Sequence, residues 1–194
     1  MSVTIPIVPQ EAVTALAAGL RQLAVSPLVA ARLPRGAAAI KRFTTARAAS
    51  PAAQPAISLQ YFVFGLSDVS RGITAARQVG WRHLLPIGDP AGPALADTAI
   101  RGSSQYVFAA LTESPFASDL EARLAVLPGD PTVSAGSYTA AVLEVPESNV
   151  MAIWLRDTAH NDDLFVPVAP APPALTAGRQ YSTSQFLGAL RPAS

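Results

Sequence analysis

The apolar side chains near the start of the chain follow a helical pattern. Within Gln10–Ala24 they recur at spacings of three and four residues, which bring side chains to one face of an α-helix. An amphipathic helix is therefore expected there, and two shorter helices are expected over 28–33 and 37–49. The face of the first helix is formed by Val13, Leu16, Leu20 and Leu23.

From residue 57 onward the pattern changes to short runs that are rich in β-branched and aromatic side chains, as is typical of strands. A short edge strand is also expected over 3–8, while 105–111 fits either a strand or the start of a helix. Pro146–Asn149 separates two of the strongest runs, so an antiparallel hairpin is expected there. The runs are 57–64, 81–87, 94–100, 138–145, 150–155 and 164–168.

Two further helices are expected in the second half of the chain. Ser114 and Pro115 form an N-cap and first-turn signature, and the leucines that follow recur at helical spacing as far as Leu127. A short C-terminal helix is expected over Ser184–Leu190. These elements predict an α+β fold with an antiparallel sheet of about five to seven strands, an N-terminal helical segment, one mid-chain helix and a short C-terminal helix.

Charge is distributed unevenly along the chain. Residues 1–56 hold six basic residues and one acidic residue, whereas residues 57–194 hold eight basic and twelve acidic residues. Pro and Ala dominate 50–55, so we expect a basic helical arm over 1–50 and an α+β domain over 56–194. The basic side chains that could meet a partner are Arg32, Arg35, Lys41, Arg42 and Arg47.

The composition narrows the function classes. Only 14% of the residues are charged, against about 25% in an average protein, which favours coverage of part of the surface by another chain. The chain has no cysteine, so disulfides, thiolate nucleophiles and cysteine-ligated metals are excluded. A single lysine beside thirteen arginines is typical of a bacterial genome of high GC content. No P-loop, dinucleotide-binding or metallopeptidase motif is present, and no cofactor is expected.

Two groups of polar residues are candidates for a functional site. Asp157, His160, Asp162 and Asp163 supply nitrogen and oxygen donors for a divalent cation, although the same residues are typical of a solvated hairpin turn. For Trp81-Arg82-His83 the expectation is a strand with Trp81 and His83 packed on one face and Arg82 directed to solvent. For the first group, Asp157 to Asp163, a solvated hairpin turn is favoured over a cation site.

The leading prediction is a non-enzymatic component that associates with copies of itself or with other protein chains. The helical face, the basic segment and the proline-rich 167–173 would make the contacts. One alternative is a small hydrolase that uses a metal ion or one of the two histidines, His83 and His160. A second alternative is a nucleic-acid or anionic-surface binder through 32–47. The N-terminus lacks secretory features and no apolar stretch is long enough to span a membrane, so a cytoplasmic location is expected.

Overall fold

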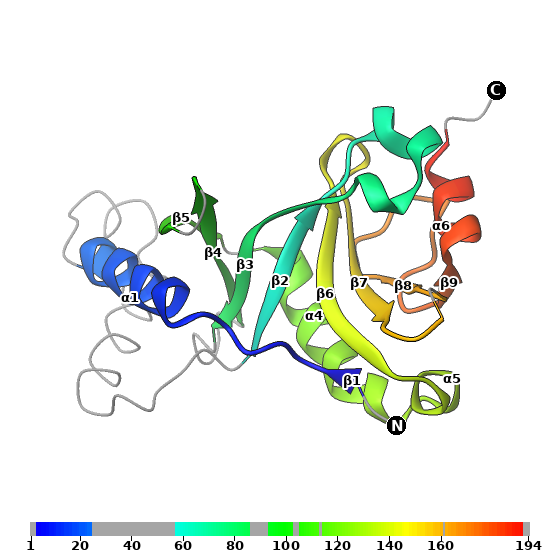
Figure 1. The fold of residues 1–194 in the computed structure, drawn as a ribbon, viewed down its shortest axis with the longest axis horizontal. Helices are drawn as coiled ribbons and strands as arrows, with labels where there is room; N and C mark the ends of the chain where they lie inside the picture. The colour runs from blue at the N-terminus through cyan, green and yellow to red at the C-terminus, as the bar shows by residue number, and fades with distance from the viewer. Residues whose placement is uncertain are drawn as a thin grey trace. The chain divides into compact units, whose positions relative to one another are not determined.

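The computed structural model describes residues 3–24, 57–85, 93–102, 105–112, 114–160 and 162–191. These residues form a mixed α+β structure with one sheet of nine mostly antiparallel strands and several helices (Figure 1). They divide into two compact units. Unit 1 contains the described parts of 1–7, 59–79 and 118–194, and unit 2 contains those of 8–58 and 80–117.

The strands of unit 1 are arranged around a central hairpin. In this hairpin β6 (Tyr138–Val145) pairs antiparallel with β7 (Val150–Asp157). The strands β8 (Leu164–Pro167) and β9 (Tyr181–Ser182) continue the antiparallel pairing beyond β7. On the other edge of β6, two strands pair with it in parallel. They are β1 (Val3–Thr4) and β2 (Ile57–Val63), of which residues 59–63 belong to unit 1.

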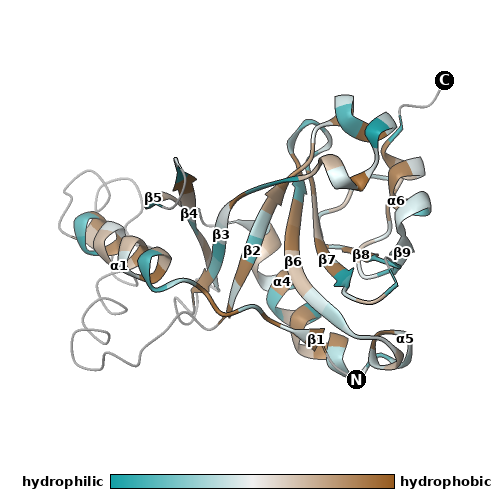
Figure 2. Cartoon of the chain, viewed as in Figure 1, coloured by the Kyte–Doolittle hydropathy of each residue, from teal (hydrophilic) through white to brown (hydrophobic). Residues whose placement is uncertain are grey.

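One face of this sheet packs on α6 (Thr183–Leu190) through a column of aromatic rings. The rings of Trp154 and Phe165 stack with centroids 5.8 Å apart, and those of Phe165 and Phe186 stack at 4.5 Å. Ser182 and Gln185 form a capping box that begins α6. Figure 2 shows hydrophobic colour on β2, β7 and the upper part of β6, and on α6. This face therefore holds the main core of unit 1.

The helix α4 (Pro115–Val126) begins at the Ser114 cap as expected, and its residues 118–126, which belong to unit 1, lie behind β6 in the view of Figure 1. Leu120 and Leu124 on this helix are buried. The short helix α5 (Pro131–Ala135) was not expected, because its five residues are too few to show a helical pattern. Unit 1 also contains 3₁₀ helices, namely η1 (Leu66–Arg71), η2 (Ile73–Ala75), η3 (Leu127–Gly129) and η4 (Pro146–Ser148).

Unit 2 packs one helix on an antiparallel meander. The helix α1 (Gln10–Ala24) has the predicted bounds. The strands are residues 80–85 of β3 (Arg77–Leu85), then β4 (Ala94–Arg101) and β5 (Gln105–Thr112). Residues 105–111, which fitted either a strand or a helix, are thus a strand. The small core of this unit contains Leu16, Leu20, Leu85, Ala94 and Ala96.

The sheet differs from the expectation in size and in pairing. Nine strands are present in place of five to seven, and β6 has two parallel neighbours within a sheet that was expected to be antiparallel. β9 has two residues, too few for an alternating pattern to reveal it, while β1 is confined to two of the residues of 3–8. The helices expected over 28–33 and 37–49 and the boundary at 50–55 lie outside the described residues, so these predictions remain predictions.

None of the described helices is long and apolar enough to span a membrane.

Candidate ligand-binding site

Unit 1 contains a cleft of about 730 Å³ over one face of the strands β2, β6 and β7. We call it the Arg156 cleft, after the one basic residue among those that line it. Its polar lining consists of Gln60, Thr74, Thr139, Arg156, Asp157, Thr158 and Asp163. Its apolar lining consists of Pro6, Phe62, Ile73, Ala76 and Trp154.

The strand register explains why these side chains meet. Gln60 on β2 is aligned with Ala141 on β6, which is aligned with Trp154 on β7. Because side chains alternate along a strand, Phe62 lies on the same face as Gln60, and Arg156 on the same face as Trp154. The sheet therefore presents two aromatic rings, one amide and one guanidinium at one end of the face that packs on α6.

Arg156 has an unusual set of neighbours. Its Cζ atom lies 5.2 Å from the centroid of the Phe62 ring and 5.1 Å from that of the Trp154 ring. These two rings meet edge to face at 5.0 Å. Its Nη1 donates a hydrogen bond to Gln60 Oε1 at 3.3 Å. Within the described part of the chain no carboxylate forms an ion pair with this half-buried guanidinium.

The acidic turn between β7 and β8 forms one wall of the cleft. Asp163 accepts hydrogen bonds from the indole Nε1 of Trp154 and from the backbone N–H of Asp157, both at 2.8 Å. Asp157 accepts a 2.7 Å bond from the backbone N–H of Ala159, which is the main cause of its pKa lying below the ordinary value. Both carboxylates therefore hold the turn in place, and the lowered pKa of Asp157 keeps that side chain ionised at neutral pH.

The residues proposed as metal ligands all lie in this turn. The His160 side chain is 79% exposed, and its Nδ1 lies 3.5 Å from Asp157 Oδ2. Asp162 is exposed, and its backbone N–H approaches Asp157 Oδ2 at 3.4 Å. Among the described residues no three His, Cys, Asp or Glu side chains are grouped so as to hold a metal ion. The hydrogen bonds that the aspartates accept from backbone N–H groups are those of a hairpin turn.

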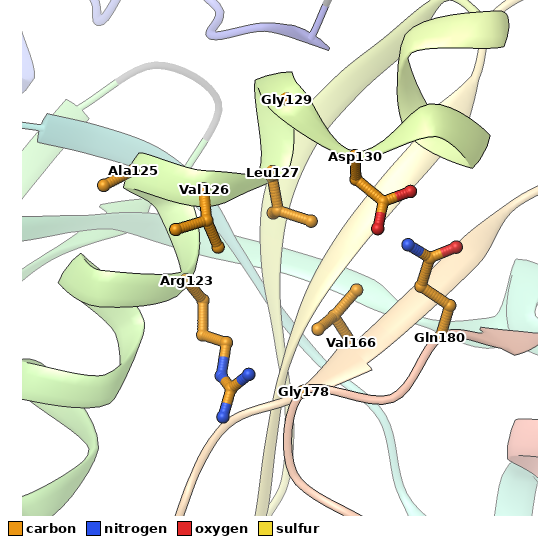
Figure 3. Close-up of a pocket in the computed structure, with 9 residues that line it drawn as sticks. All are labelled: Arg123, Ala125, Val126, Leu127, Gly129, Asp130, Val166, Gly178 and Gln180. Carbon is orange, nitrogen blue, oxygen red and sulfur yellow. The ribbon is translucent and has the colours of Figure 1, made fainter.

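A second cleft of about 420 Å³ lies on the opposite face of the sheet in unit 1. Figure 3 shows Arg123 directed toward Gly178, while the side chains of Asp130 and Gln180 point toward one another. Gly178 has a positive φ of 80°, and a Cβ there would overlap the Arg123 guanidinium, so glycine is required at this position. Arg123 is already paired through its Nε with Asp119 Oδ2 at 3.2 Å. The basic residue of this cleft, unlike Arg156, is therefore paired with a carboxylate.

Asp130 in the second cleft caps α5, and we expect Asp130→Ala to cost about 1 kcal/mol of unfolding free energy at pH 7. Its Oδ1 accepts hydrogen bonds from the backbone N–H groups of Thr132 and Val133. The hydrogen bond from Gln180 is the largest of the effects that lower its pKa. A lowered folded-state pKa means that the carboxylate's contribution is complete above about 3.9, the value in unfolded chains, and is lost as the pH falls through the folded value.

Urea unfolding of the wild type and of Asp130→Ala at pH 7 and pH 2.5 checks this expectation. The difference in unfolding free energy between the two proteins should be smaller at pH 2.5 than at pH 7. Glu121→Ala, at an exposed position of α4, serves as the control and should stay within about 0.5 kcal/mol at both pH values. If Asp130→Ala lowers the unfolding free energy equally at both pH values, ionisation of Asp130 adds nothing to the cap.

The polar residues of β3 in unit 2 lie in the interior. Arg82 is 7% exposed and forms a bidentate pair with Asp97, with Nε–Oδ1 and Nη2–Oδ2 distances of 2.8 Å. The expectation that Arg82 points to solvent is therefore wrong. The two residues are directly opposite in the β3–β4 register, and this pairing offsets the cost of burying the guanidinium.

His83 is fully buried between two hydroxyl groups. Its Nδ1 lies 2.9 Å from Ser58 Oγ and its Nε2 lies 3.0 Å from Thr98 Oγ1. The expectation that His83 and Trp81 pack in the interior is confirmed, because they are 0% and 3% exposed. Neither side chain lines the Arg156 cleft or the second cleft.

The residues expected to bind a partner fall into two groups. Val13, Leu16 and Leu20 are at most 6% exposed, and the two leucines pack on strands of unit 2, while Leu23 is half-buried. Most of this face is thus used within the chain. The basic side chains Arg32, Arg35, Lys41, Arg42 and Arg47 lie outside the described residues.

The patterns in the sequence did not indicate the Arg156 cleft. The available signal was the alternation of Gln60 with Phe62 in one predicted strand and of Trp154 with Arg156 at the end of another, which was predicted to stop at residue 155. That β2 and β7 both flank β6 follows only from the parallel pairing of β2, which the strand patterns do not encode. No protein-family model, curated protein or solved structure matches the chain.

Proposed function

We propose that unit 1 binds a small organic molecule that carries an acidic group, and that Arg156 receives this group. The observation that carries the proposal is the position of the Arg156 guanidinium, which lies over two aromatic rings in a cleft and is not paired with a described carboxylate. The other stacked arginine of unit 1, Arg179, lies over Tyr181 in an exposed position and lines neither cleft.

Stacking prepares an arginine for anion binding. The rings of Phe62 and Trp154 both lie within about 5 Å of the guanidinium carbon and restrict the movement of the group, while most of its N–H groups remain available. One of these donors is used by Gln60. The others can form a bidentate pair with a carboxylate or phosphate group, in the geometry that gives the stronger charge-assisted hydrogen bonds.

The size and polarity of the cleft support a small ligand. Its volume of about 730 Å³ lies within the range of about 300–1,000 Å³ that is usual for small-molecule sites. The hydroxyl groups of Thr74, Thr139 and Thr158 line the same space and can donate or accept hydrogen bonds. The described lining thus offers one basic anchor and three neutral hydroxyl groups beside the two carboxylates of the acidic turn.

An equilibrium titration with benzoate tests the proposal, with the neutral isostere benzamide as the reference ligand. Trp154 lies in the wall of the cleft, so its fluorescence should report binding, and Trp81→Phe removes the signal of unit 2. We expect benzoate to bind with a dissociation constant of about 1 mM, as is reasonable for so small a ligand. Arg156→Met should weaken binding by about tenfold or more, because it removes a charge-assisted hydrogen bond.

Arg179→Met is the matched control, since it also removes one stacked arginine and changes the net charge equally. This variant should bind benzoate as the wild type does. Equal binding of benzoate and benzamide, or equal losses in the two variants, would refute the proposal.

The hypothesis of a histidine-dependent hydrolase has less support in the described residues. The hydrogen bond between Ser58 and His83 resembles that of a nucleophile and its base, but these residues are 8% and 0% exposed, so a substrate has little access to them. Association with other protein chains, which the low charge content favours, remains a separate prediction.

A further inference from the structure

Acidic residues outnumber basic residues among the described residues that line the Arg156 cleft. Arg156 is the one basic residue of the lining, whereas Asp157 and Asp163 are both acidic. A ligand whose acidic group pairs with Arg156 therefore lies in the same cleft as two negative charges. This arrangement bears on which acids the cleft accepts.

The two carboxylates are fixed where they are. Each Asp163 oxygen accepts a 2.8 Å hydrogen bond, one from the Trp154 indole and one from a backbone N–H. Asp157 accepts hydrogen bonds from the backbone N–H groups of Ala159 and Asp162. Rotation of either side chain away from an incoming anion would break these bonds, so both negative charges stay in the wall of the cleft.

The remaining lining is suited to an uncharged, apolar group. Pro6, Ile73 and Ala76 supply aliphatic surface, while the edges of Phe62 and Trp154 complete the same space. Burial of apolar ligand surface against these side chains contributes about 25 cal/mol per Å². A ligand with a hydrocarbon body therefore gains affinity that a bare inorganic anion does not.

We propose that the Arg156 cleft selects small monocarboxylic acids with an apolar body and discriminates against ligands with two negative charges. The proposal rests on the function proposed above and specifies its ligand class. The carboxylate pairs with Arg156, the body contacts the aliphatic and aromatic wall, and a second anionic group is repelled by Asp157 and Asp163. Like charges in a partly solvated site lower affinity by about fivefold to tenfold.

Three ligands separate these contributions in the Trp81→Phe background, by titration of the Trp154 fluorescence at pH 7 and low salt. Benzoate has one carboxylate and an apolar ring, isophthalate has a second carboxylate on the same ring, and acetate has no ring. We expect benzoate to bind about fivefold or more tightly than isophthalate, and acetate to bind more weakly than benzoate.

A variant tests the origin of the discrimination. Asp157→Asn removes the charge and keeps an Oδ1 acceptor for the Ala159 N–H, so the shorter of the two backbone hydrogen bonds is preserved and the 3.4 Å bond from Asp162 is lost. It should improve isophthalate binding by about threefold more than benzoate binding. Asp162→Asn is the matched control, because Asp162 is exposed in the same turn and does not line the cleft. This change should alter the ratio of the isophthalate and benzoate affinities less than Asp157→Asn does.

The outcomes distinguish this inference from the proposed function. Arg156-dependent binding in which isophthalate or acetate matches benzoate would overturn the inference and leave the acid-binding function intact. An unchanged affinity ratio in Asp157→Asn would likewise overturn it. No Arg156-dependent binding of any of the three anions would refute the proposed function, and the inference with it.

Discussion

Asp97→Ala is expected to lower the free energy of unfolding by about 3 kcal/mol or more. The Arg82 and Asp97 side chains are 8% and 15% exposed and form two hydrogen bonds of 2.8 Å across β3 and β4. Removal of the carboxylate leaves a buried guanidinium without its bidentate partner, and one-sided loss of a buried pair typically costs about 3–5 kcal/mol. Urea unfolding followed by circular dichroism measures the effect.

Two further variants identify the cause of this loss. Asp68→Ala removes a carboxylate from an exposed pair, in which the Arg71 side chain is 71% exposed, and should cost less than about 1 kcal/mol. Arg82→Met combined with Asp97→Leu replaces both buried charges with apolar side chains and should recover most of the stability. If Asp97→Ala costs no more than Asp68→Ala, the buried pair is not a significant element of unit 2.

Gly19→Leu is expected to destabilise unit 2 by about 3 kcal/mol, at the upper end of the usual range for overpacking. Gly19 lies on the buried side of α1, where a Cβ would overlap Cβ and Cγ of Phe108 on β5. Because the Cβ of Phe108 is fixed to its backbone, rotation of the ring cannot relieve this overlap. The helix must move away from the strand, which loosens the packing of Leu16 and Leu20.

Gly188→Ala provides the opposite test in another helix. Gly188 is exposed in α6, and a Cβ there has no neighbour within 4 Å. Alanine is the better helix former, so this change should stabilise the protein by about 0.5–1 kcal/mol. Thermal unfolding should thus shift in opposite directions for the two glycine variants. A stabilising effect of Gly19→Leu would contradict the close contact between α1 and β5.

Local patterns in the sequence were sufficient for the longer elements. The helix over Gln10–Ala24 was predicted with its observed bounds, because its apolar spacing is regular over four turns. The hairpin of β6 and β7 was predicted from two apolar runs that are separated by a short turn. In each case the residues that determine the element lie within the element or next to it.

The parallel pairing of β2 with β6 depends on residues that are distant in the chain. Residues 60–63 pair with residues 141–144, and no turn signal connects them. The two-residue strands β1 and β9 exist only because a longer strand provides hydrogen-bonding partners. Sequence patterns therefore underestimated the sheet and did not reveal its parallel part.

The error at Arg82 has a similar cause. Strand alternation correctly predicts that Arg82 lies on the face opposite Trp81 and His83. The assumption that this second face is exposed was wrong, because Asp97 on the next strand supplies a carboxylate that pairs with the guanidinium. Arg156 was missed for a comparable reason, since its neighbours Gln60 and Phe62 come from a strand almost a hundred residues away.

The most direct test of the account is an NMR titration that observes the side-chain Nε–H of Arg156 as benzoate is added. The missing resonance in the spectrum of Arg156→Met assigns this signal. The account predicts a saturable shift of the Arg156 resonance with the same dissociation constant as the Trp154 fluorescence change, and no comparable shift for Arg179. An Arg156 resonance that stays in place at saturating benzoate, or that shifts equally with benzamide, would contradict the central claim that this guanidinium binds an acidic ligand.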